Sequence, residues 1–444
     1  MSRSDAPTPA TPSRRGVLAA GLLGLTVPAL GSCARFTGNY SSAESLRFWS
    51  LFSGGDGVLL VDILDTIGPT VGAVHSTVLE WGPPYYTKLA MASTGGRGPD
   101  LAILHLSRVP GYAPGGLLEP FDLDLLAEFG VHPEDFDQEL WSRGVFDGEQ
   151  RAIPMDTHPF ICFYRREPLD AVGMLTTDGV LRPFDGPEDF LASLDELRGS
   201  TGETPLSFGH INDDAMAWRL FWSLMNQQGT RFELGEGVAD IDVDGVESVM
   251  TFLGQLFDGE RALGNLQPAA AEASFSNGRS AMHFNGEWEL TTFRDAGVPD
   301  LAASPFPAVL GEPAGAADSH SFVLPAQLAA DPAKRRQAHQ FVAEFLKASI
   351  TWAEAGHIPA YSPITASPEY AELEPQSSYV QAADSAALDP QAWFTGSGSE
   401  FQREAGFPTQ SAMLGGDPAQ AAADLVAYCE SRAAQPNPTR GGAR

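Results

Sequence analysis

The sequence predicts an α/β protein with two lobes, and three observations support this. From residue 45 onward, short apolar segments alternate with segments of helical periodicity, which is typical of βαβ units. Glycine-rich segments separate several of these elements, as at residues 53–57 and 95–98, and such segments favour turns. The chain has 444 residues, which is more than one ordinary hydrophobic core accommodates.

The elements follow in order along the chain. Strands are expected at residues 45–52, 76–79 and 100–105, with helices at residues 58–67 and 86–93 between them. Further helices are expected at residues 187–197, 214–227, 246–256, 333–348 and 418–432, and further strands at residues 160–164, 280–284 and 321–324. The chain has no internal repeat, and its Pro- and Gly-rich end, residues 435–444, is expected to be a disordered tail.

The amino terminus has the pattern of an export signal. Arg14 and Arg15 precede an apolar run over residues 17–30, which is too short to span a membrane. The run ends in Leu-Gly-Ser-Cys at residues 30–33, which resembles a bacterial lipobox. The paired arginines resemble a twin-arginine (Tat) export signal.

We therefore expect a signal peptide at residues 1–32, a diacylglycerol anchor on Cys33 and a tether at residues 33–43. An uncleaved anchor helix is the alternative. Because no other stretch is apolar enough for a membrane span, the rest of the chain is expected to lie outside the cytoplasm, held by lipid at the outer face of the cell membrane.

The composition limits the expected partners. The formal net charge of −30 disfavours nucleic acid, because a polyanion repels phosphates. The nine histidines show no metal-ligand spacing such as His-Glu-x-x-His, and no Walker or Gly-x-Ser-x-Gly pattern is present. We expect no cofactor, no metal and a monomer. Cys162 and Cys429 are expected to be separate buried thiols, although a disulfide is the alternative outside the cytoplasm.

Candidate binding residues follow from the expected strand ends. In open α/β sheets, ligands bind beyond the carboxyl ends of the strands, because loop side chains converge there. The loops expected at this edge cover residues 53–57, 105–108, 156–158, 286–288 and 357–361. The candidates in and near these loops are Trp49, Asp56, Glu80, Trp81, His105, Asp156, His158, Trp288, His320, His357 and Tyr361.

These candidates have different expected roles. Trp288 follows a predicted strand and is expected to offer its ring face to a ligand, with a core position as the alternative. Asp156 and His158 are two residues apart and share one face of an extended segment, where Asp156 would accept hydrogen bonds from hydroxyls. Asp56 either accepts such bonds or caps the next helix. For the histidines, a purely structural role is the alternative.

Seven segments carry a family resemblance. They are Leu-Arg-Phe-Trp-Ser at residues 46–50, Tyr-Tyr-Thr-Lys-Leu at 85–89, Gly-Pro-Asp-Leu-Ala at 98–102, Gly-Leu-Leu-Glu-Pro at 116–120, Ile-Pro-Met-Asp-Thr at 153–157, Ala-Met-His-Phe-Asn-Gly-Glu-Trp at 281–288 and Gly-His-Ile-Pro-Ala at 356–360. In order and spacing they resemble extracellular solute-binding proteins of ABC sugar importers, the maltose-binding-protein-like family. Two segments depart from the common family pattern, Arg165-Arg166 after Tyr164 and Asp-Ser-His-Ser at residues 318–321.

The resemblance implies a two-lobed periplasmic-binding-protein type II fold with hinge strands and an interlobe cleft. It places residues 44–154 plus 316–358 in lobe 1 and residues 155–315 plus 359–434 in lobe 2. It further implies a substrate-binding lipoprotein, not an enzyme, that captures a di- or oligosaccharide and delivers it to an ABC permease. The alternatives are a glycerophosphodiester or polyol as the transported ligand, a secreted glycan-processing enzyme, and a ligand-sensing module for a membrane partner.

Overall fold

The computed structural model describes residues 45–329 and 331–439. The expected signal peptide, the lipid anchor on Cys33 and the tether lie outside the described residues. Among the helices in the described ranges, none is long and apolar enough to cross a membrane.

The first sheet has six strands in the order β2-β1-β3-β15-β4, with β7 paired to β15. These strands are β1 (Leu46–Ser50), β2 (Val74–Val78), β3 (Leu101–His105), β4 (Leu118–Glu119), β7 (Ala152–Pro154) and β15 (His320–Pro325). β1 runs parallel to β2 and β3, whereas β15 runs antiparallel to β3 with His320 opposite His105. The carboxyl ends of β1 to β3 and the start of β15 therefore lie at one edge of the sheet.

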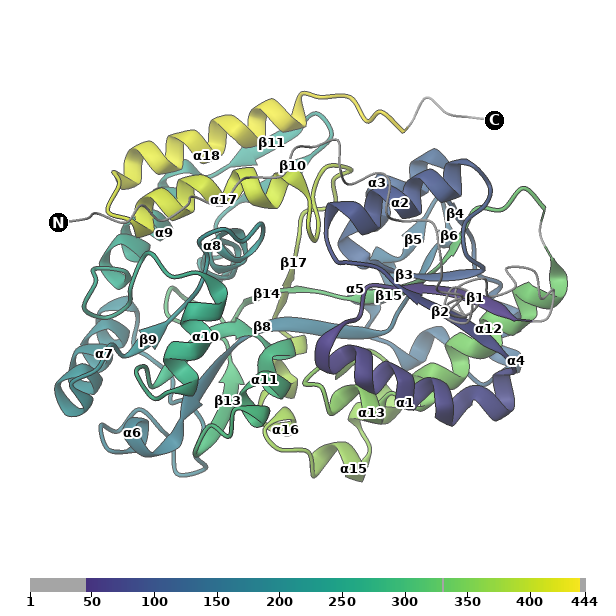
Figure 1. Ribbon diagram of the computed structural model, residues 1–444. Coiled ribbons are helices and arrows are strands. Elements are labelled where there is room, and N and C mark those ends of the chain that lie inside the picture. Colours follow the sequence, from purple (N-terminus) through teal and green to yellow (C-terminus); the bar gives the residue numbers. More distant parts are fainter. Residues whose placement is uncertain (1–44, 330, 440–444) are drawn as a thin grey trace, which may run out of the picture. The chain divides into compact units, whose positions relative to one another are not determined.

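Helices cover both faces of this sheet (Figure 1). They are α1 (Gly54–Val71), α2 (Pro83–Thr94), α3 (Val109–Tyr112), α4 (Leu123–Glu128), α5 (Gln138–Arg143), α12 (Pro332–Lys347) and α13 (Ile350–Ala353). α1 buries Leu60, Ile63, Ile67 and Val71, a spacing of three or four residues that places them on one helix face. That face gives α1 its packing against α12 and α13.

The second sheet is built around one long strand, β8 (Asp156–Arg165), which is buried along all but its last residue. The other strands of this sheet are β9 (Leu206–Ser207), β12 (Met282–Gly286), β13 (Leu301–Pro305), β14 (Gly315–Asp318), β16 (Ile358–Pro359) and β17 (Ala386–Leu388). β8 pairs antiparallel with β12, β13, β14 and β16. Such continuous burial fits the mostly apolar residues 159–164 of this strand.

A second set of helices belongs to this sheet. They are α6 (Arg166–Asp170), α7 (Pro187–Thr201), α8 (Met216–Gln227), α9 (Val243–Leu256), α10 (Pro268–Ser276), α11 (Leu290–Asp295), α16 (Gln376–Tyr379), α17 (Glu400–Met413) and α18 (Pro418–Ala433). α8, α9, α17 and α18 pack on one another. Other short elements are β5 (Val145–Phe146), β6 (Glu149–Gln150), β10 (Phe232–Gly235), β11 (Val238–Ile241), α14 (Ser362–Thr365) and α15 (Pro368–Ala371).

Each sheet has its own hydrophobic core. The first core contains Phe48, Ile103, Phe322 and Phe341, and the second contains Phe160, Trp218, Leu253 and Phe284. Two large separate cores are what a chain of this length is expected to form. The predicted two-lobed α/β fold is thus confirmed, and we call the part around the first sheet lobe 1 and the part around the second sheet lobe 2.

The chain passes between the two sheets at strand junctions. β7 leads into β8 through Met155, and β14 leads into β15 through Ser319. The second passage therefore falls later than the boundary at residue 316 that the sequence predicts, because β14 pairs with β8 and β17 of the second sheet. The chain passes between the sheets a third time at β16. Because β16 pairs with the first two residues of β8, this third passage lies beside the first.

Several local predictions need correction. The glycine-rich residues 53–57 are not a turn before a helix, because α1 begins at Gly54. Asp56 lies in the first turn of α1 and does not cap it; the N-cap residue is Ser53. Within the predicted disordered tail, Asn437 is buried and its backbone N–H donates to Glu236. Cys162 and Cys429 are free and buried, as the preferred interpretation of the sequence predicts.

Candidate binding site

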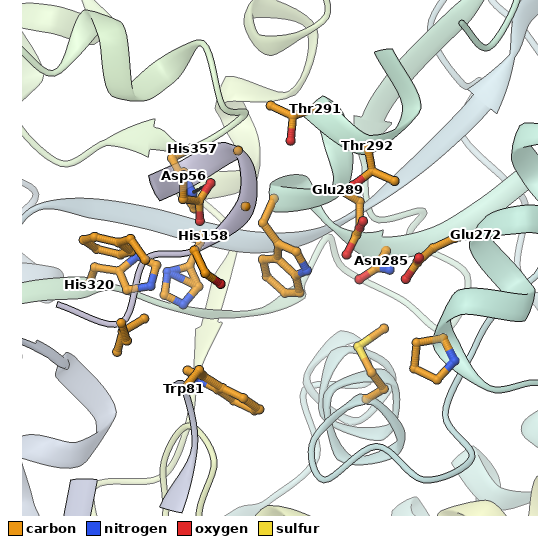
Figure 2. Close-up of a pocket in the computed structure, with 18 of the residues that line it drawn as sticks. Asp56, Trp81, His158, Glu272, Asn285, Glu289, Thr291, Thr292, His320 and His357 are labelled. Carbon is orange, nitrogen blue, oxygen red and sulfur yellow. Dashed lines mark ion pairs between the residues drawn. The ribbon is translucent and has the colours of Figure 1, made fainter. Parts of the chain in front are cut away.

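A cavity of about 390 Å³ lies between the facing edges of the two sheets. Figure 2 shows Asp56, His158, His320 and His357 on one side of it. Glu272, Asn285 and Glu289 face them from the other side. The candidate residues from the sequence that line the cavity are Asp56, Trp81, His105, His158, Trp288, His320 and His357.

Lobe 1 contributes its strand ends to the cavity. The segment after β1 supplies Phe52 and Asp56, the loop after β2 supplies Trp81, β3 ends at His105, and β15 begins at His320. These residues converge because the carboxyl ends of the parallel strands and the start of β15 share one edge.

Lobe 2 contributes residues that the sequence reasoning missed. They are Asp213 before α8, Met216 and Arg219 on α8, Pro268 and Glu272 on α10, and Asn285, Glu289, Thr291 and Thr292 around β12 and α11. Asn285 and Glu289 flank Trp288 directly, so their proximity in sequence was a usable signal. The residues of α8 and α10 gave no such signal, because their contact with the cavity depends on how the helices pack.

Trp288 follows β12 and lines the cavity from the lobe 2 side. Its ring faces the Arg219 guanidinium at 4.9 Å from the ring centroid, a cation–π contact. The ring centroid of His158 is 6.0 Å from that of Trp288, with the rings nearly perpendicular. A side chain at Gly286 would overlap the indole, since a Cβ there would lie 1.9 Å from Cζ3 of Trp288. The indole can therefore lie in this position only because residue 286 is a glycine.

Gly286→Ala is expected to displace the Trp288 ring without removing it, because two carbon atoms cannot approach this closely. The indole should become more accessible, which a shift in tryptophan fluorescence and faster acrylamide quenching would show. Gly235→Ala, at an open position, is the control. Unchanged fluorescence in Gly286→Ala would contradict the described contact.

Three histidines from three strands lie together at the base of the cavity. The ring centroids of His158 and His320 are 4.3 Å apart, and His105 lies 4.6 Å from His320 and 5.1 Å from His158. Burial lowers the pKa of His105 and His158 well below the ordinary value, and the proximity of His320 lowers both further. His105 and His158 are therefore neutral near pH 7.

Asp156 lies behind these histidines and is fully buried. Its carboxylate accepts hydrogen bonds from the backbone N–H and Nδ1 of His320 and from Nε1 of Trp352, each at 2.8 Å. Burial alone would raise the pKa of Asp156, but the nearby His320 and the hydrogen bonds outweigh it, so the pKa falls below the ordinary value. The carboxylate is thus ionised and its oxygens already have partners.

His357 connects the two lobes. Its Nε2 lies 3.3 Å from Asp56 of lobe 1, and its Nδ1 lies 2.8 Å from Glu287 of lobe 2. Burial opposes protonation of His357, but Asp56 and Glu287 raise its pKa well above the ordinary value. Burial raises the pKa of Glu287 to about 7, against the effect of His357. The ring of His357 also stacks on Trp352 at 4.5 Å between ring centroids.

Glu289, on the lobe 2 side, has a pKa raised to about 7, mainly by burial and further by Glu272. In the unfolded chain its pKa returns to about 4.5. A carboxyl group whose pKa is higher in the folded state stabilises the fold at pH values below its unfolded pKa. This stabilisation is lost as the pH rises through its folded pKa. Ionised Glu289 therefore destabilises the fold above about pH 7.

The Glu289→Gln variant is expected to be more stable than the original protein when the pH is above the folded pKa of Glu289, about 7. Near pH 4.5, the ordinary pKa of this group, the two proteins should have similar stability. The amide cannot ionise, so it avoids burying a charge. Urea unfolding in alkaline and acidic buffers measures the difference. Glu233→Gln, at an exposed position of β10, should show no such dependence on pH. An equal effect of Glu289→Gln in both buffers would contradict the assignment.

Four predicted binding residues lie outside the cavity. Asp156 has no exposed surface, its oxygens bind protein donors, and it does not line the cavity. Trp49 lies in a separate surface depression with Lys88 over its ring at 5.2 Å. Glu80 is exposed outside the lining, and Tyr361 packs against Phe136 within lobe 1.

Two α/β lobes, each with its own core, that present strand ends and aromatic rings to a shared cavity define a two-lobed binding protein. The chain belongs to the bacterial extracellular solute-binding protein family, whose sequence model matches residues 82–383, more than half of the chain. This family membership confirms the resemblance seen in the sequence and places the protein outside the cytoplasm.

Solved structures show the same fold. The GacH receptor of Streptomyces glaucescens GLA.O, solved unliganded and with acarbose, has a TM-score of 0.70 at 18% identity, covering 86% of this chain and 97% of the receptor. The cyclic α-maltosyl-1,6-maltose binding protein of Arthrobacter globiformis has a TM-score of 0.66 at 18% identity, covering 87% of this chain and 99% of that protein. At this identity the likeness establishes the fold.

Proposed function

We propose that the protein is the substrate-binding lipoprotein of an ABC importer and that it captures a neutral di- or oligosaccharide between its lobes. The observation that carries this proposal is the cavity itself, which combines Trp81 and Trp288 with hydroxyl, amide and carboxylate groups. Sugar rings pack on aromatic faces, and their hydroxyls bind planar acceptors and donors. The ligands named for the two similar structures, acarbose and a cyclic maltosyl-maltose, support the same class.

The charge of the lining favours a neutral ligand over a phosphodiester. Four carboxylate residues line the cavity, Asp56, Asp213, Glu272 and Glu289, whereas Arg219 is the one lysine or arginine among the described lining residues. Arg219 is also engaged with the Trp288 ring. His357 adds a second positive charge but is paired with Asp56, so the lining stays net negative and an anionic ligand would face net repulsion there.

Lobe closure would couple ligand capture to delivery. Contacts between the lobes lie beside the cavity. His357 pairs with Glu287 at 2.8 Å. Gly55 of α1 lies so close to Thr291 that a Cβ on Gly55 would be only 2.6 Å from Oγ1 of Thr291. These contacts require the lobes to meet, so a ligand held by both lobes shifts the population toward the closed form. The permease would then engage the closed form.

A saccharide panel tests the proposal. Maltose, sucrose, lactose, acarbose and cyclic α-maltosyl-1,6-maltose are each added to the purified protein, and thermal unfolding and tryptophan fluorescence are recorded. A bound saccharide should raise the melting temperature, because it binds only the folded state. Chromatography should recover the saccharide intact; cleavage would support a glycan-processing enzyme instead. No response to any saccharide would contradict the carbohydrate assignment.

We further infer that the protein is exported by the twin-arginine route and held by lipid on Cys33. The lipobox-like residues 30–33 and the preceding paired arginines support this. Cys33→Ala in the producing cell should move the protein from the membrane fraction to the soluble extracytoplasmic fraction. Unchanged membrane retention would contradict the lipid anchor.

A further inference from the structure

The three histidines at the base of the cavity have the arrangement of a metal-binding site. His105, His158 and His320 offer ring nitrogens that all lie within 4.8 Å of one another. All three are buried, and all three line the cavity. Three imidazole ligands around one open position suit a zinc-class divalent ion.

Sheet pairing holds these rings in place. His320 lies directly opposite His105 across the β3–β15 pair. His158 is on β8, where it lies opposite Asp318 of β14, the strand that leads through Ser319 into β15. Ligands on paired strands are positioned more rigidly than ligands on loops.

Hydrogen bonds orient each ring through Nδ1. Asp156 contacts Nδ1 of His320 at 2.8 Å and Nδ1 of His158 at 3.4 Å. Because a carboxylate oxygen accepts hydrogen bonds, these contacts favour the proton on Nδ1 of both rings and leave a lone pair on Nε2. Nδ1 of His105 lies 2.8 Å from Oη of Tyr86. Metal-binding histidines are commonly oriented in this way by a carboxylate or another polar partner at the second nitrogen.

A competing set of ligands is less suitable. Asp156, His320 and His357 also lie close enough to hold an ion. However, Asp156 is occupied by Trp352 and His320, and His357 is paired with Asp56 and Glu287. Among the described residues, the hydrogen bonds of His105, His158 and His320 all use Nδ1, which leaves Nε2 of each ring for an ion.

We propose that His105, His158 and His320 bind a zinc-class divalent metal ion through Nε2 at the base of the interlobe cavity, with Asp156 and Tyr86 orienting the rings. The remaining coordination position faces the cavity. The proposal goes beyond the saccharide-binding function and does not depend on it. It also differs from the expectation of no metal site, because the three ligands come from strands far apart in the sequence.

Titration of the chelator-treated protein with Zn²⁺ tests the proposal. Calorimetry should show one site per chain. Co²⁺ should give the visible absorption of a four-coordinate site with three nitrogen ligands, and added Zn²⁺ should abolish it by displacing Co²⁺. His158→Gln and His320→Gln should each lose this site, whereas His210→Gln, a buried histidine of lobe 2 that lies outside the cavity, should keep it. Binding that is unchanged in both cavity variants, or no binding by the original protein, would overturn the proposal.

A second pair of variants separates metal binding from misfolding. Tyr86→Phe removes the oxygen beside His105 and should weaken Zn²⁺ binding about 10- to 100-fold. Tyr112→Phe is the matched control, because Tyr112 is also buried but donates its hydrogen bond to the backbone oxygen of Tyr86. Equal Zn²⁺ affinity in the two variants would overturn the orienting role of Tyr86. Saccharide titration of the same metal-free protein tests the transport function separately.

Discussion

Trp288→Ala is expected to weaken saccharide binding by roughly 1–3 kcal/mol, which is a loss of about 5- to 150-fold in affinity. The indole lines the cavity and is held between Arg219 and His158. Its removal would take away the ring face on which a sugar packs, while each lobe keeps its own core. Fluorescence titration or calorimetry with acarbose or another saccharide that binds measures the change.

Trp49→Ala is the matched control for this prediction. Trp49 is also a partly buried tryptophan, but it lies in a separate depression of lobe 1. Its replacement should leave saccharide affinity unchanged. If Trp288→Ala binds as well as the original protein, or if Trp49→Ala weakens binding equally, the cavity is not the saccharide site.

Asp156→Ala is expected to lower the free energy of unfolding by about 3–5 kcal/mol, because three buried donors lose their acceptor and each costs about 1–3 kcal/mol when left unsatisfied. The carboxylate accepts bonds from the backbone and ring of His320 and from Trp352. Without it, these buried donors lose their acceptor. Urea unfolding followed by circular dichroism measures the loss.

An exposed aspartate provides the comparison. Asp65→Ala on α1 should change the free energy of unfolding by less than about 0.5 kcal/mol, as is usual at such surface positions. A similarly small effect of Asp156→Ala would show that the network around Asp156 does not support the junction of β7 and β8.

The sequence predicts the strands and helices of lobe 1 well, because their apolar periodicity is local. The helix at α1 and the strands at β1 to β3 were each expected close to their observed positions. α10 and α17 were not expected. α17 contains Pro408, and proline normally argues against a helix interior, so packing against α8, α9 and α18 overrides the local preference.

The candidate site was predictable only where strand ends supply its residues. Strand ends converge by a general rule, and this rule located Asp56, Trp81, His105 and Trp288. Arg219 was missed because α8 is buried on most faces, and a pattern of apolar residues does not show which face meets the cavity.

Asp156 shows a different limit of sequence reasoning. Its position after the expected passage between lobes suggested a ligand contact, but its role depends on Trp352 from α13 and His320 from β15. Neither partner is near it in the sequence. The histidine cluster was missed as a metal site for the same reason, because its spacing arises from strand pairing and not from a local motif.

Small-angle X-ray scattering with and without a bound saccharide tests the central claim most directly. We predict that a saturating saccharide lowers the radius of gyration, because a guest held by both lobes favours the closed form, and that Trp288→Ala requires more saccharide for the same change. An unchanged radius of gyration, at a concentration where fluorescence shows full binding, would contradict closure of the two lobes over the ligand.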